Sequence, residues 1–145
     1  MRVGRAIAKY LKPQDIICLS GELGSGKTVL AKGIASGLKI GAFDITSPSF
    51  VIMRPHLQGK LPFYHFDLYR LKDAQDISAL GYEEYFYGEG VSVIEWPEKL
   101  GCLIPEECLK VELSYQGEFK RKLKFYAQGE RYKALLKNIH ENIGN

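Results

Sequence analysis

Cysteine is scarce in this sequence, and its three residues form no pattern of a known kind. Cys18, Cys102 and Cys108 are odd in number and contain no C-x-x-C spacing, so the sequence indicates neither a disulfide framework nor a cysteine-based zinc site. Cys18 lies in an apolar stretch, where a free cysteine behaves as a small hydrophobic residue. Cysteine usage of this kind is typical of a reducing compartment, and we expect the protein to be cytoplasmic.

Long hydrophobic stretches are also lacking. No run approaches the roughly 20 apolar residues that a membrane-spanning helix needs, and the first five residues contain no apolar signal core. Of the 145 residues, 46% are hydrophobic and 26% are charged, which is an ordinary composition for a globular protein. We therefore expect a single domain over residues 1–145, with no membrane partner.

Positive charge is concentrated near the end of the chain. Residues 1–109 carry 12 basic and 13 acidic side chains, whereas residues 110–145 carry 8 basic and 4 acidic ones. A local excess of this kind is most often a solvated face, and it can also attract a partner of opposite charge. The sequence leaves both interpretations open.

One glycine-rich stretch carries the clearest chemical signal in the chain. Residues 21–28 read GELGSGKT and match the template G-x-x-x-x-G-K-[ST] at every fixed position. Glycine has no Cβ, so the backbone can take positive φ angles and turn several N–H groups toward one anion. Lys27 would reach the β- and γ-phosphates as a point charge, and Thr28 would offer its hydroxyl to Mg²⁺. The predicted nucleotide-binding residues are Glu22, Leu23, Gly24, Ser25, Gly26, Lys27, Thr28 and Val29.

The segments on either side of this stretch favour a phosphate-binding loop. Residues 16–20 form a short apolar run that predicts a buried strand, and residues 29–38 carry apolar side chains at helical spacing. A helix that begins at the loop adds its own N–H groups and the positive end of its dipole. The alternative is a glycine-rich turn that happens to hold a lysine, and the flanking strand and helix make it much the weaker one.

The rest of the chain alternates between helical and strand patterns. Strands are predicted at 15–20, 49–54, 62–70 and 91–96, and helices at 2–11, 74–80, 82–87 and 130–143. Residues 109–125 alternate between apolar and polar side chains around a central turn, which predicts an antiparallel hairpin with one solvated face. We expect a three-layer α/β fold of the P-loop nucleoside triphosphatase type, with a mainly parallel central sheet and a C-terminal antiparallel hairpin.

Hydrolysis needs acidic groups beyond the phosphate-binding loop, and two acids end predicted strands. Asp67 ends the stretch 63–67, and Glu95 ends the stretch 91–95. In a doubly wound sheet both strand ends fall in the crevice where ligands bind, so either acid can hold Mg²⁺ or its water. The alternative for each is a strand-end carboxylate paired with a basic residue such as Arg70. Spacing alone does not decide which acid contacts the metal.

Two other polar segments have competing explanations. Residues 46–49, Thr-Ser-Pro-Ser, follow the predicted phosphate helix, where loops often sense a γ-phosphate, and they can equally be a plain hydroxyl-rich turn. His65 alternates with Asp67, and no second histidine or cysteine stands at ligand spacing. We therefore expect His65 to be a half-buried strand residue rather than a metal ligand.

Missing motifs narrow the possible activities. The Asn-Lys-x-Asp stretch typical of guanine-specific proteins is lacking, so ATP is favoured over GTP. No basic insertion of lid length lies between residues 70 and 100, which disfavours the alternative of a small-molecule kinase, and no arginine finger is evident. A module that binds nucleotide without hydrolysing it is a third possibility, and the two strand-end acids argue weakly against it.

Several stretches, in this order, closely resemble one protein family. They cover most of the chain, from near Gly4 to the final helix, and the HFDLYR and IEWPE stretches are far more specific than the glycine-rich loop. The family is the bacterial ATPase family TsaE, formerly YjeE, which takes part in tRNA threonylcarbamoyladenosine biosynthesis. The resembling stretches are LSG at 19–21 with the loop to Thr28, TSPSF at 46–50, HFDLYR at 65–70, GYEEY at 81–85 and VIEWP at 93–97.

The resemblance implies a weak, Mg²⁺-dependent ATPase that binds ATP and ADP. It implies that Thr28 and Glu95 hold Mg²⁺, and that Asp67, Glu95 and Lys27 serve hydrolysis. The implied partners are the threonylcarbamoyl transferase subunit and its paralogous companion subunit, with tRNA contacted indirectly through their complex. ATP hydrolysis would reset that complex between turnovers. Family members carry an N-terminal strand that helps to wall the adenine, whereas Met1 stands almost at the first helix here, so the resemblance assigns no residue of this chain to the base.

Overall fold

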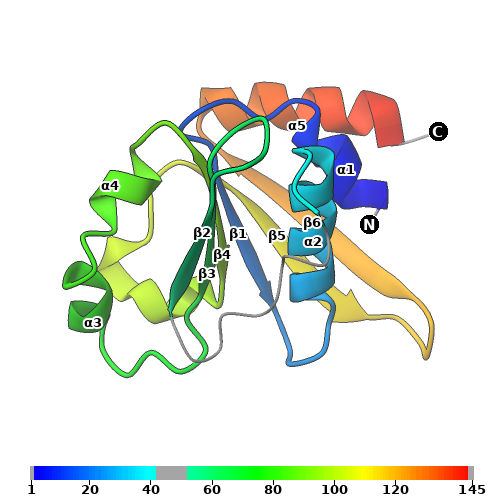
Figure 1. The fold of residues 1–145 in the computed structure, drawn as a ribbon. Coiled ribbons are helices and arrows are strands. Elements are labelled where there is room, and N and C mark those ends of the chain that lie inside the picture. The colour runs from blue at the N-terminus through cyan, green and yellow to red at the C-terminus, as the bar shows by residue number, and fades with distance from the viewer. Residues whose placement is uncertain (1, 42–51, 144–145) are drawn as a thin grey trace.

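The computed structural model describes residues 2–41 and 52–143, which form a six-stranded sheet with helices on both faces (Figure 1). The four central strands β3, β4, β1 and β5 run parallel, and β2 and β6 pair antiparallel at the two edges. This arrangement confirms the predicted fold class. The strand order across the sheet is β2 (Met53–His56), β3 (Phe63–Asp67), β4 (Val91–Glu95), β1 (Ile16–Gly21), β5 (Cys108–Tyr115) and β6 (Arg121–Gln128).

One face of the sheet is covered by the helices α1 (Arg2–Ala8), α2 (Lys27–Gly37) and α5 (Glu130–Ile143). Their apolar side chains share one buried cluster with the strands, in which Ile34 of α2 and Leu135 of α5 are completely buried. Glycine permits a close approach between α1 and α2, because a Cβ on Gly37 would lie only 2.4 Å from the Cβ of Ala8. The helix that follows the glycine-rich loop is therefore packed closely against both the sheet and α1.

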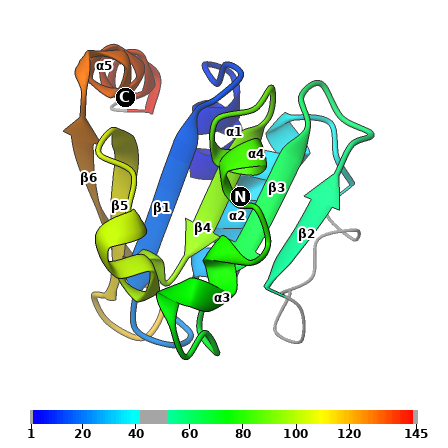
Figure 2. The ribbon, with the colours of Figure 1, turned by 90° about the vertical axis from the view of Figure 1, so that its left-hand side faces the viewer.

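The opposite face carries shorter segments, which Figure 2 shows in front of the sheet. They are the helices α3 (Ala74–Ser78) and α4 (Glu83–Phe86) and the 3-10 helix η2 (Pro97–Leu103). A second buried cluster joins this layer to the strands and includes Phe66 and Phe86, whose rings meet edge to face at 5.2 Å. On neither face does a helix within the described residues have the length and apolar character needed to cross a membrane.

The C-terminal strands β5 and β6 form the predicted antiparallel hairpin. Their pairing runs from Cys108 opposite Gln128 to Tyr115 opposite Arg121. The turn of the hairpin projects beyond the helical layers (Figure 1), and Phe119 in this turn is 90% exposed. The hairpin therefore ends as a protruding arm beside the glycine-rich loop.

Two of the four predicted strands, 49–54 and 62–70, differ from the structure by more than one residue at an end, whereas 15–20 and 91–96 differ by one residue. The strand expected at 49–54 is observed as β2 at Met53–His56, and residues 49–51 lie outside the described part of the chain. The segment 46–49, for which the sequence allows either a γ-phosphate sensor or a plain turn, also lies outside it. The strand expected at 62–70 ends at Asp67. It ends there because the chain turns, with the N–H of Leu71 bonded to the carbonyl of Leu68 at 3.0 Å.

The prediction that His65 is half-buried is wrong, since its side chain is completely buried. His65 lies on the same side of β3 as Phe63, which belongs to the cluster beneath α1, α2 and α5. An apolar layer therefore covers a position that the sequence pattern placed at the margin of the core.

Strand β2 is an edge strand with an unusual residue in its middle. Pro55 pairs with Tyr64 of β3 and has no N–H group to offer to the ladder. Proline is tolerated within sheets almost only on edge strands, where its nitrogen faces away from the neighbouring strand. The outer side of β2 therefore lacks one hydrogen-bond donor.

Three parallel strands bring chemically active residues to one edge of the sheet. β1 ends at Gly21, where the glycine-rich loop begins, and β3 and β4 end at Asp67 and Glu95. Asp67 and Glu95 are paired in the ladder between β3 and β4. The carboxyl ends of parallel strands are the usual ligand-binding edge of an open α/β sheet, so the fold places both predicted acids beside the loop.

Candidate functional site

The glycine-rich loop, residues 21–28, connects β1 directly to the first turn of α2. Gly21, Gly24 and Gly26 have φ angles of 148°, 79° and 108°, which lie in a region that residues with a side chain rarely adopt. A Cβ on Gly21 would also lie 2.4 Å from the carbonyl oxygen of Leu113. The loop conformation therefore requires glycine at these positions, which is the physical reason for the sequence pattern.

The Lys27 side chain folds back over its own loop. Its ammonium group donates hydrogen bonds to the carbonyl oxygens of Gly21 at 2.6 Å and Glu22 at 2.9 Å. It also lies 4.2 Å from the centre of the Trp96 ring. Burial lowers the pKa of Lys27, and the nearby Glu95 carboxylate acts in the opposite direction. The charge is thus held in a mostly enclosed place by acceptors that a phosphate oxygen could replace.

Thr28 and Glu95 are in direct contact across the site. The Thr28 hydroxyl lies 3.0 Å from Oε1 and 3.2 Å from Oε2 of Glu95. The same carboxylate is bound from the other side by His65, whose Nε2 lies 2.5 Å from Oε2. Glu95 is almost completely buried, so these two contacts fix its orientation in the site.

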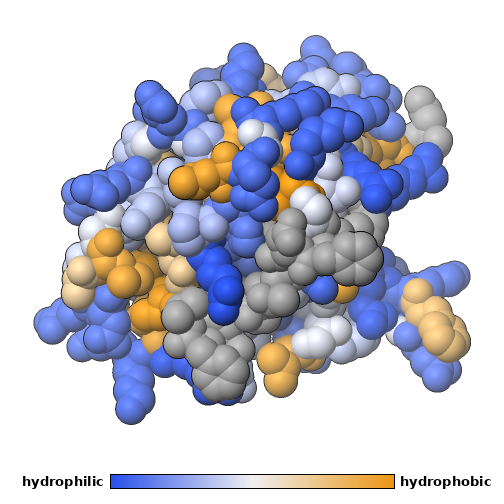
Figure 3. Space-filling model, in the orientation of Figure 1, coloured by the Kyte–Doolittle hydropathy of each residue, from blue (hydrophilic) through white to orange (hydrophobic). Residues whose placement is uncertain are grey.

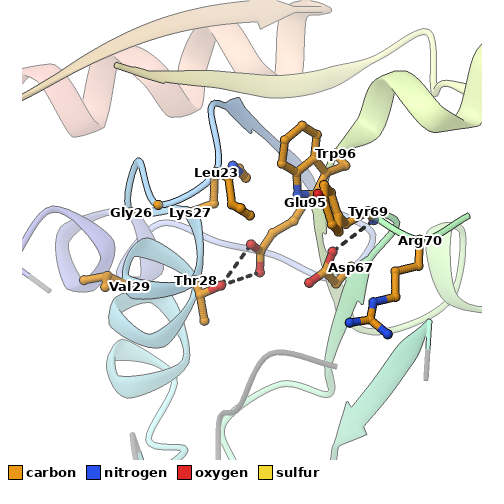
Figure 4. A pocket seen from close by; sticks show the side chains of 11 residues that line it. Leu23, Gly26, Lys27, Thr28, Val29, Asp67, Tyr69, Arg70, Glu95 and Trp96 are labelled. Atoms are coloured by element: carbon orange, nitrogen blue, oxygen red, sulfur yellow. Dashed lines mark hydrogen bonds between the residues drawn. The ribbon is translucent and has the colours of Figure 1, made fainter. Parts of the chain in front are cut away.

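Asp67 ends β3 next to Glu95, and Figure 4 shows both carboxylates directed toward the side of the site where Thr28 lies. The backbone N–H of Tyr69 donates to Oδ1 of Asp67 at 3.1 Å. This bond forms within the turn that follows the strand, so the end of β3 both places the carboxylate and holds it. Two acids on adjacent strands thus face the same cavity, with Glu95 buried more deeply than Asp67.

These groups line one cavity of about 390 Å³ (Figure 4). The structure brings together there the residues that the sequence predicted as catalytic, Lys27, Asp67 and Glu95, and the second predicted metal ligand, Thr28. Two predicted nucleotide-binding residues do not line it, Glu22 and Ser25. The predicted nucleotide-binding residues that do line it are Leu23, Gly24, Gly26, Lys27, Thr28 and Val29.

Ser25 and Glu22 contribute to the loop in other ways. The backbone N–H of Ser25 donates to the carbonyl of Glu22 at 3.0 Å, which tightens the turn. The Ser25 hydroxyl is completely buried, and it has no hydrogen-bond partner within the described residues. A buried polar atom without a partner is costly, so this hydroxyl marks a place where the loop can accept a further polar ligand.

Three residues of the cavity were not predicted from the sequence, namely Tyr69, Arg70 and Trp96. Each stands one to three residues beyond a strand end, in the turns that follow Asp67 and Glu95. The signal was available, because residues just after a parallel strand lie at the same edge of the sheet as the strand end. The rings of Tyr69 and Trp96 contact each other at 5.0 Å, so they form one wall of the cavity.

A second cavity of about 480 Å³ lies on the other side of the glycine-rich loop. It shares Gly24, Gly26 and Val29 with the first cavity, and the hairpin contributes Phe119 and Leu123 to its wall. Apolar side chains make up most of this wall, with Glu118 and Arg121 among them, whereas the first cavity also contains the charged groups of Lys27, Asp67, Arg70 and Glu95. The second cavity therefore lacks the pair of strand-end carboxylates that marks the first.

The chain is similar to proteins of one family along most of its length. Residues 1–123 match the family described as "Threonylcarbamoyl adenosine biosynthesis protein TsaE". A protein from Bacillus subtilis (strain 168), named tRNA threonylcarbamoyladenosine biosynthesis protein TsaE, is 38% identical over 145 residues, which cover 99% of this chain and 90% of that protein. A protein of the same name from Treponema pallidum (strain Nichols) is 36% identical over 122 residues, which cover 84% and 89%. The crystal structure of Bacillus subtilis YdiB is similar with a TM-score of 0.82 at 35% identity, over 97% of this chain and 86% of that one.

Proposed function

Because this chain belongs to the TsaE family of threonylcarbamoyl adenosine biosynthesis proteins, we propose that it binds and hydrolyses ATP during threonylcarbamoyladenosine modification of tRNA. In this proposal the chain acts as a nucleotide switch on the threonylcarbamoyl transferase subunit and its paralogous companion subunit. The observation that carries the proposal is the convergence of Lys27, Thr28, Asp67 and Glu95 in one cavity beside the glycine-rich loop.

The glycine-rich loop and the start of α2 are the proposed phosphate site. Lys27 donates to two carbonyl oxygens of the loop, and a charged phosphate oxygen is a stronger acceptor than either carbonyl. When nucleotide binds, a phosphate oxygen would therefore replace one of these carbonyl oxygens as the acceptor of a hydrogen bond from the Lys27 ammonium group. The N–H groups of the first turn of α2 supply further donors.

Thr28 and Glu95 are the proposed holders of Mg²⁺. In phosphate sites Mg²⁺ takes oxygen ligands, one or two from the protein and the others from phosphate and water. The Thr28 hydroxyl and the Glu95 carboxylate are hard oxygen donors that already lie 3.0 Å apart, so the residues present fit this ion. Bound there, Mg²⁺ would neutralise charge on the phosphate oxygens.

Asp67 is the proposed residue for the attacking water. One of its oxygens is held by the N–H of Tyr69, and the carboxylate is directed into the cavity (Figure 4). A carboxylate held in this way can accept a hydrogen bond from a water molecule and orient it toward a phosphorus atom. Glu95, which is deeper and bound by Thr28 and His65, is better suited to the metal.

The apolar cavity beside the loop is the proposed place for the adenine. It adjoins the phosphate site through Gly24, Gly26 and Val29, and its outer wall contains the exposed ring of Phe119. A base can stack on an aromatic ring without sequence-specific hydrogen bonds. The hairpin would then supply contacts to the adenine, for which the family resemblance identified no residue of this chain.

Turnover is proposed to be low for the protein alone and to rise with its partners. An arginine supplied by a partner can raise phosphoryl-transfer rates by roughly 10³–10⁵. ATP turnover should therefore be measured alone, with each partner subunit and with tRNA, in parallel with Asp67→Asn as an inactive control. Transfer of phosphate to an added small molecule would instead support a kinase, and tight binding with no turnover under any condition would indicate a nucleotide sensor.

A further inference from the structure

We propose that His65 is a positioning residue, whose imidazole holds the Glu95 carboxylate in the orientation that serves Thr28 and Mg²⁺. The inference rests on the proposed ATPase function, because it assigns a task to a neighbour of a proposed metal ligand. His65 is not among the described residues that line the cavity, so the proposed effect is exerted through Glu95, which does line it.

His65 and Glu95 lie on adjacent parallel strands and meet on the face that α2 covers. Nε2 of His65 lies 2.5 Å from Oε2 of Glu95, and both side chains are buried. A carboxylate that holds a metal ion must be ionised and then only accepts hydrogen bonds, so in the proposed role Nε2 of His65 is the donor. Thr28 contacts the same carboxylate from the α2 side at 3.0 Å. Glu95 is thus held by one donor from β3 and one from α2.

The surroundings of His65 indicate that Glu95 is the partner that its ring serves. Within the described residues, Nδ1 is buried with no hydrogen-bond partner, whereas Nε2 is bound to Glu95. Phe63 lies next to it on the same side of the strand, with ring centres 6.2 Å apart. An apolar side chain would suit that layer better than an imidazole does. The hydrogen bond to Glu95 therefore accounts for the presence of an imidazole at this position in an apolar layer.

Outer partners of a metal ligand fix its orientation, and their loss typically lowers metal affinity or activity by about 10–100-fold. The same reasoning applies here, because among the described residues the Glu95 carboxylate is hydrogen-bonded by Thr28 and His65. Without the bond from His65, it would keep, within this part of the chain, the Thr28 contact and could turn away from the cavity. We expect the effect to appear in Mg²⁺ binding and in kcat, with the affinity for nucleotide in the absence of Mg²⁺ unchanged.

The test compares two substitutions at His65 with a matched control. His65→Gln keeps an N–H donor at a reach similar to that of Nε2, whereas His65→Asn is too short to reach Glu95. His56→Asn is the control, because His56 is a buried histidine on β2, two strands away from Glu95. ADP binding to the full chain is measured by calorimetry in EDTA and across a Mg²⁺ titration, and folding is checked by thermal unfolding.

We expect His65→Asn to lower the Mg²⁺ affinity measured with ADP by about 10–100-fold, His65→Gln to restore most of it, and His56→Asn to match the unmodified protein. Unchanged Mg²⁺ affinity in His65→Asn, or an equal loss of ADP binding in EDTA, would overturn the role of His65 and leave the ATPase proposal intact. If the unmodified protein itself bound ADP without any effect of Mg²⁺, the proposed function would fail first. Should His65→Asn not fold, His65→Leu takes its place, because leucine suits the apolar layer.

Discussion

The ammonium nitrogen of Lys27 lies 4.2 Å from the centre of the Trp96 ring, while its hydrogen bonds go to carbonyl oxygens of its own loop. Trp96 is the only tryptophan in the chain, and it follows directly after Glu95. A cation over an indole ring changes the electrostatic surroundings of that ring. Movement of Lys27 toward a phosphate would therefore be reported by a single fluorophore.

The first prediction concerns Lys27. Adding ADP or ATP should change the emission of Trp96, and Lys27→Ala should weaken nucleotide binding by roughly 10–100-fold, since hydrogen bonds to charged groups contribute about 1.5–3 kcal/mol. Fluorescence titration and calorimetry measure both effects. The control is Lys9→Ala, which removes an exposed lysine that is not among the residues lining the cavity. Equal affinities for Lys27→Ala and the unmodified protein would remove the loop from the proposed site.

The second prediction separates the two acids. Glu95→Ala should weaken Mg²⁺-dependent nucleotide binding, because a metal ligand acts before the reaction as well as during it. Asp67→Ala should largely spare binding and lower turnover by about 10²–10⁴-fold, the usual contribution of a residue that handles a proton. Calorimetry with Mg²⁺ and a phosphate-release assay distinguish the two. The opposite pattern would mean that the two roles are exchanged.

The third prediction concerns the attachment of α5. The buried backbone N–H of Ile16 donates to the hydroxyl oxygen of Tyr132 at 2.9 Å. Tyr132→Phe leaves that N–H unsatisfied and should lower the free energy of unfolding by about 1–3 kcal/mol. Urea denaturation at pH 7 measures the loss. Tyr87→Phe, which alters a tyrosine that is 55% exposed, should leave the midpoint where it is.

A pH dependence follows from the same tyrosine. Burial raises the pKa of Tyr132 to about 12, whereas in the unfolded chain a tyrosine ionises near its ordinary pKa of about 10. Between these values the unfolded chain binds fewer protons than the folded one, so stability falls as the pH rises from 10 to 12. Tyr132→Phe should lack this part of the alkaline loss. If the free energy of unfolding fell equally steeply with pH above pH 10 in both proteins, the loss could not be assigned to Tyr132.

The fourth prediction tests the geometry of the loop. A Cβ on Gly21 would lie 2.4 Å from the carbonyl oxygen of Leu113, whereas Gly117 has a similarly positive φ with nothing within 4 Å. Both Gly21→Ala and Gly117→Ala carry backbone strain of about 1–3 kcal/mol, and only the first adds a clash and distorts the loop. We expect Gly21→Ala alone to lose nucleotide binding, measured by calorimetry. If Gly21→Ala bound nucleotide as tightly as the unmodified protein, the loop would tolerate the change and the prediction would be wrong.

Much of the candidate site could be predicted because its signals are local. The glycine-rich loop lies between a strand and a helix whose periodicities are visible in the sequence, and its glycines are required by their own φ angles. Asp67 and Glu95 could be placed because parallel strands end at one edge. These inferences need only the order of elements along the chain.

The contact between His65 and Glu95 could not be predicted in the same way. It depends on which strands are neighbours and on their register, since Asp67 pairs with Glu95 and places His65 beside Val93. The sequence pattern suggested a half-buried histidine because it shows alternation along β3 and nothing of the layer above it. Tyr69, Arg70 and Trp96 follow the ends of parallel strands, so their place at the ligand-binding edge could have been inferred, but these turns have no periodicity that shows which side chains face the cavity.

Pro55 has a consequence for the behaviour of the protein in concentrated solution. An incoming strand that tried to extend the sheet beyond β2 would meet a missing donor at Pro55, so templated growth of the sheet is interrupted there. At the far edge, Lys122 and Lys124 of β6 are exposed, and a second copy pairing in antiparallel fashion would bring like charges together. Both margins of the sheet therefore disfavour the addition of a further strand and, with it, fibril-like self-association.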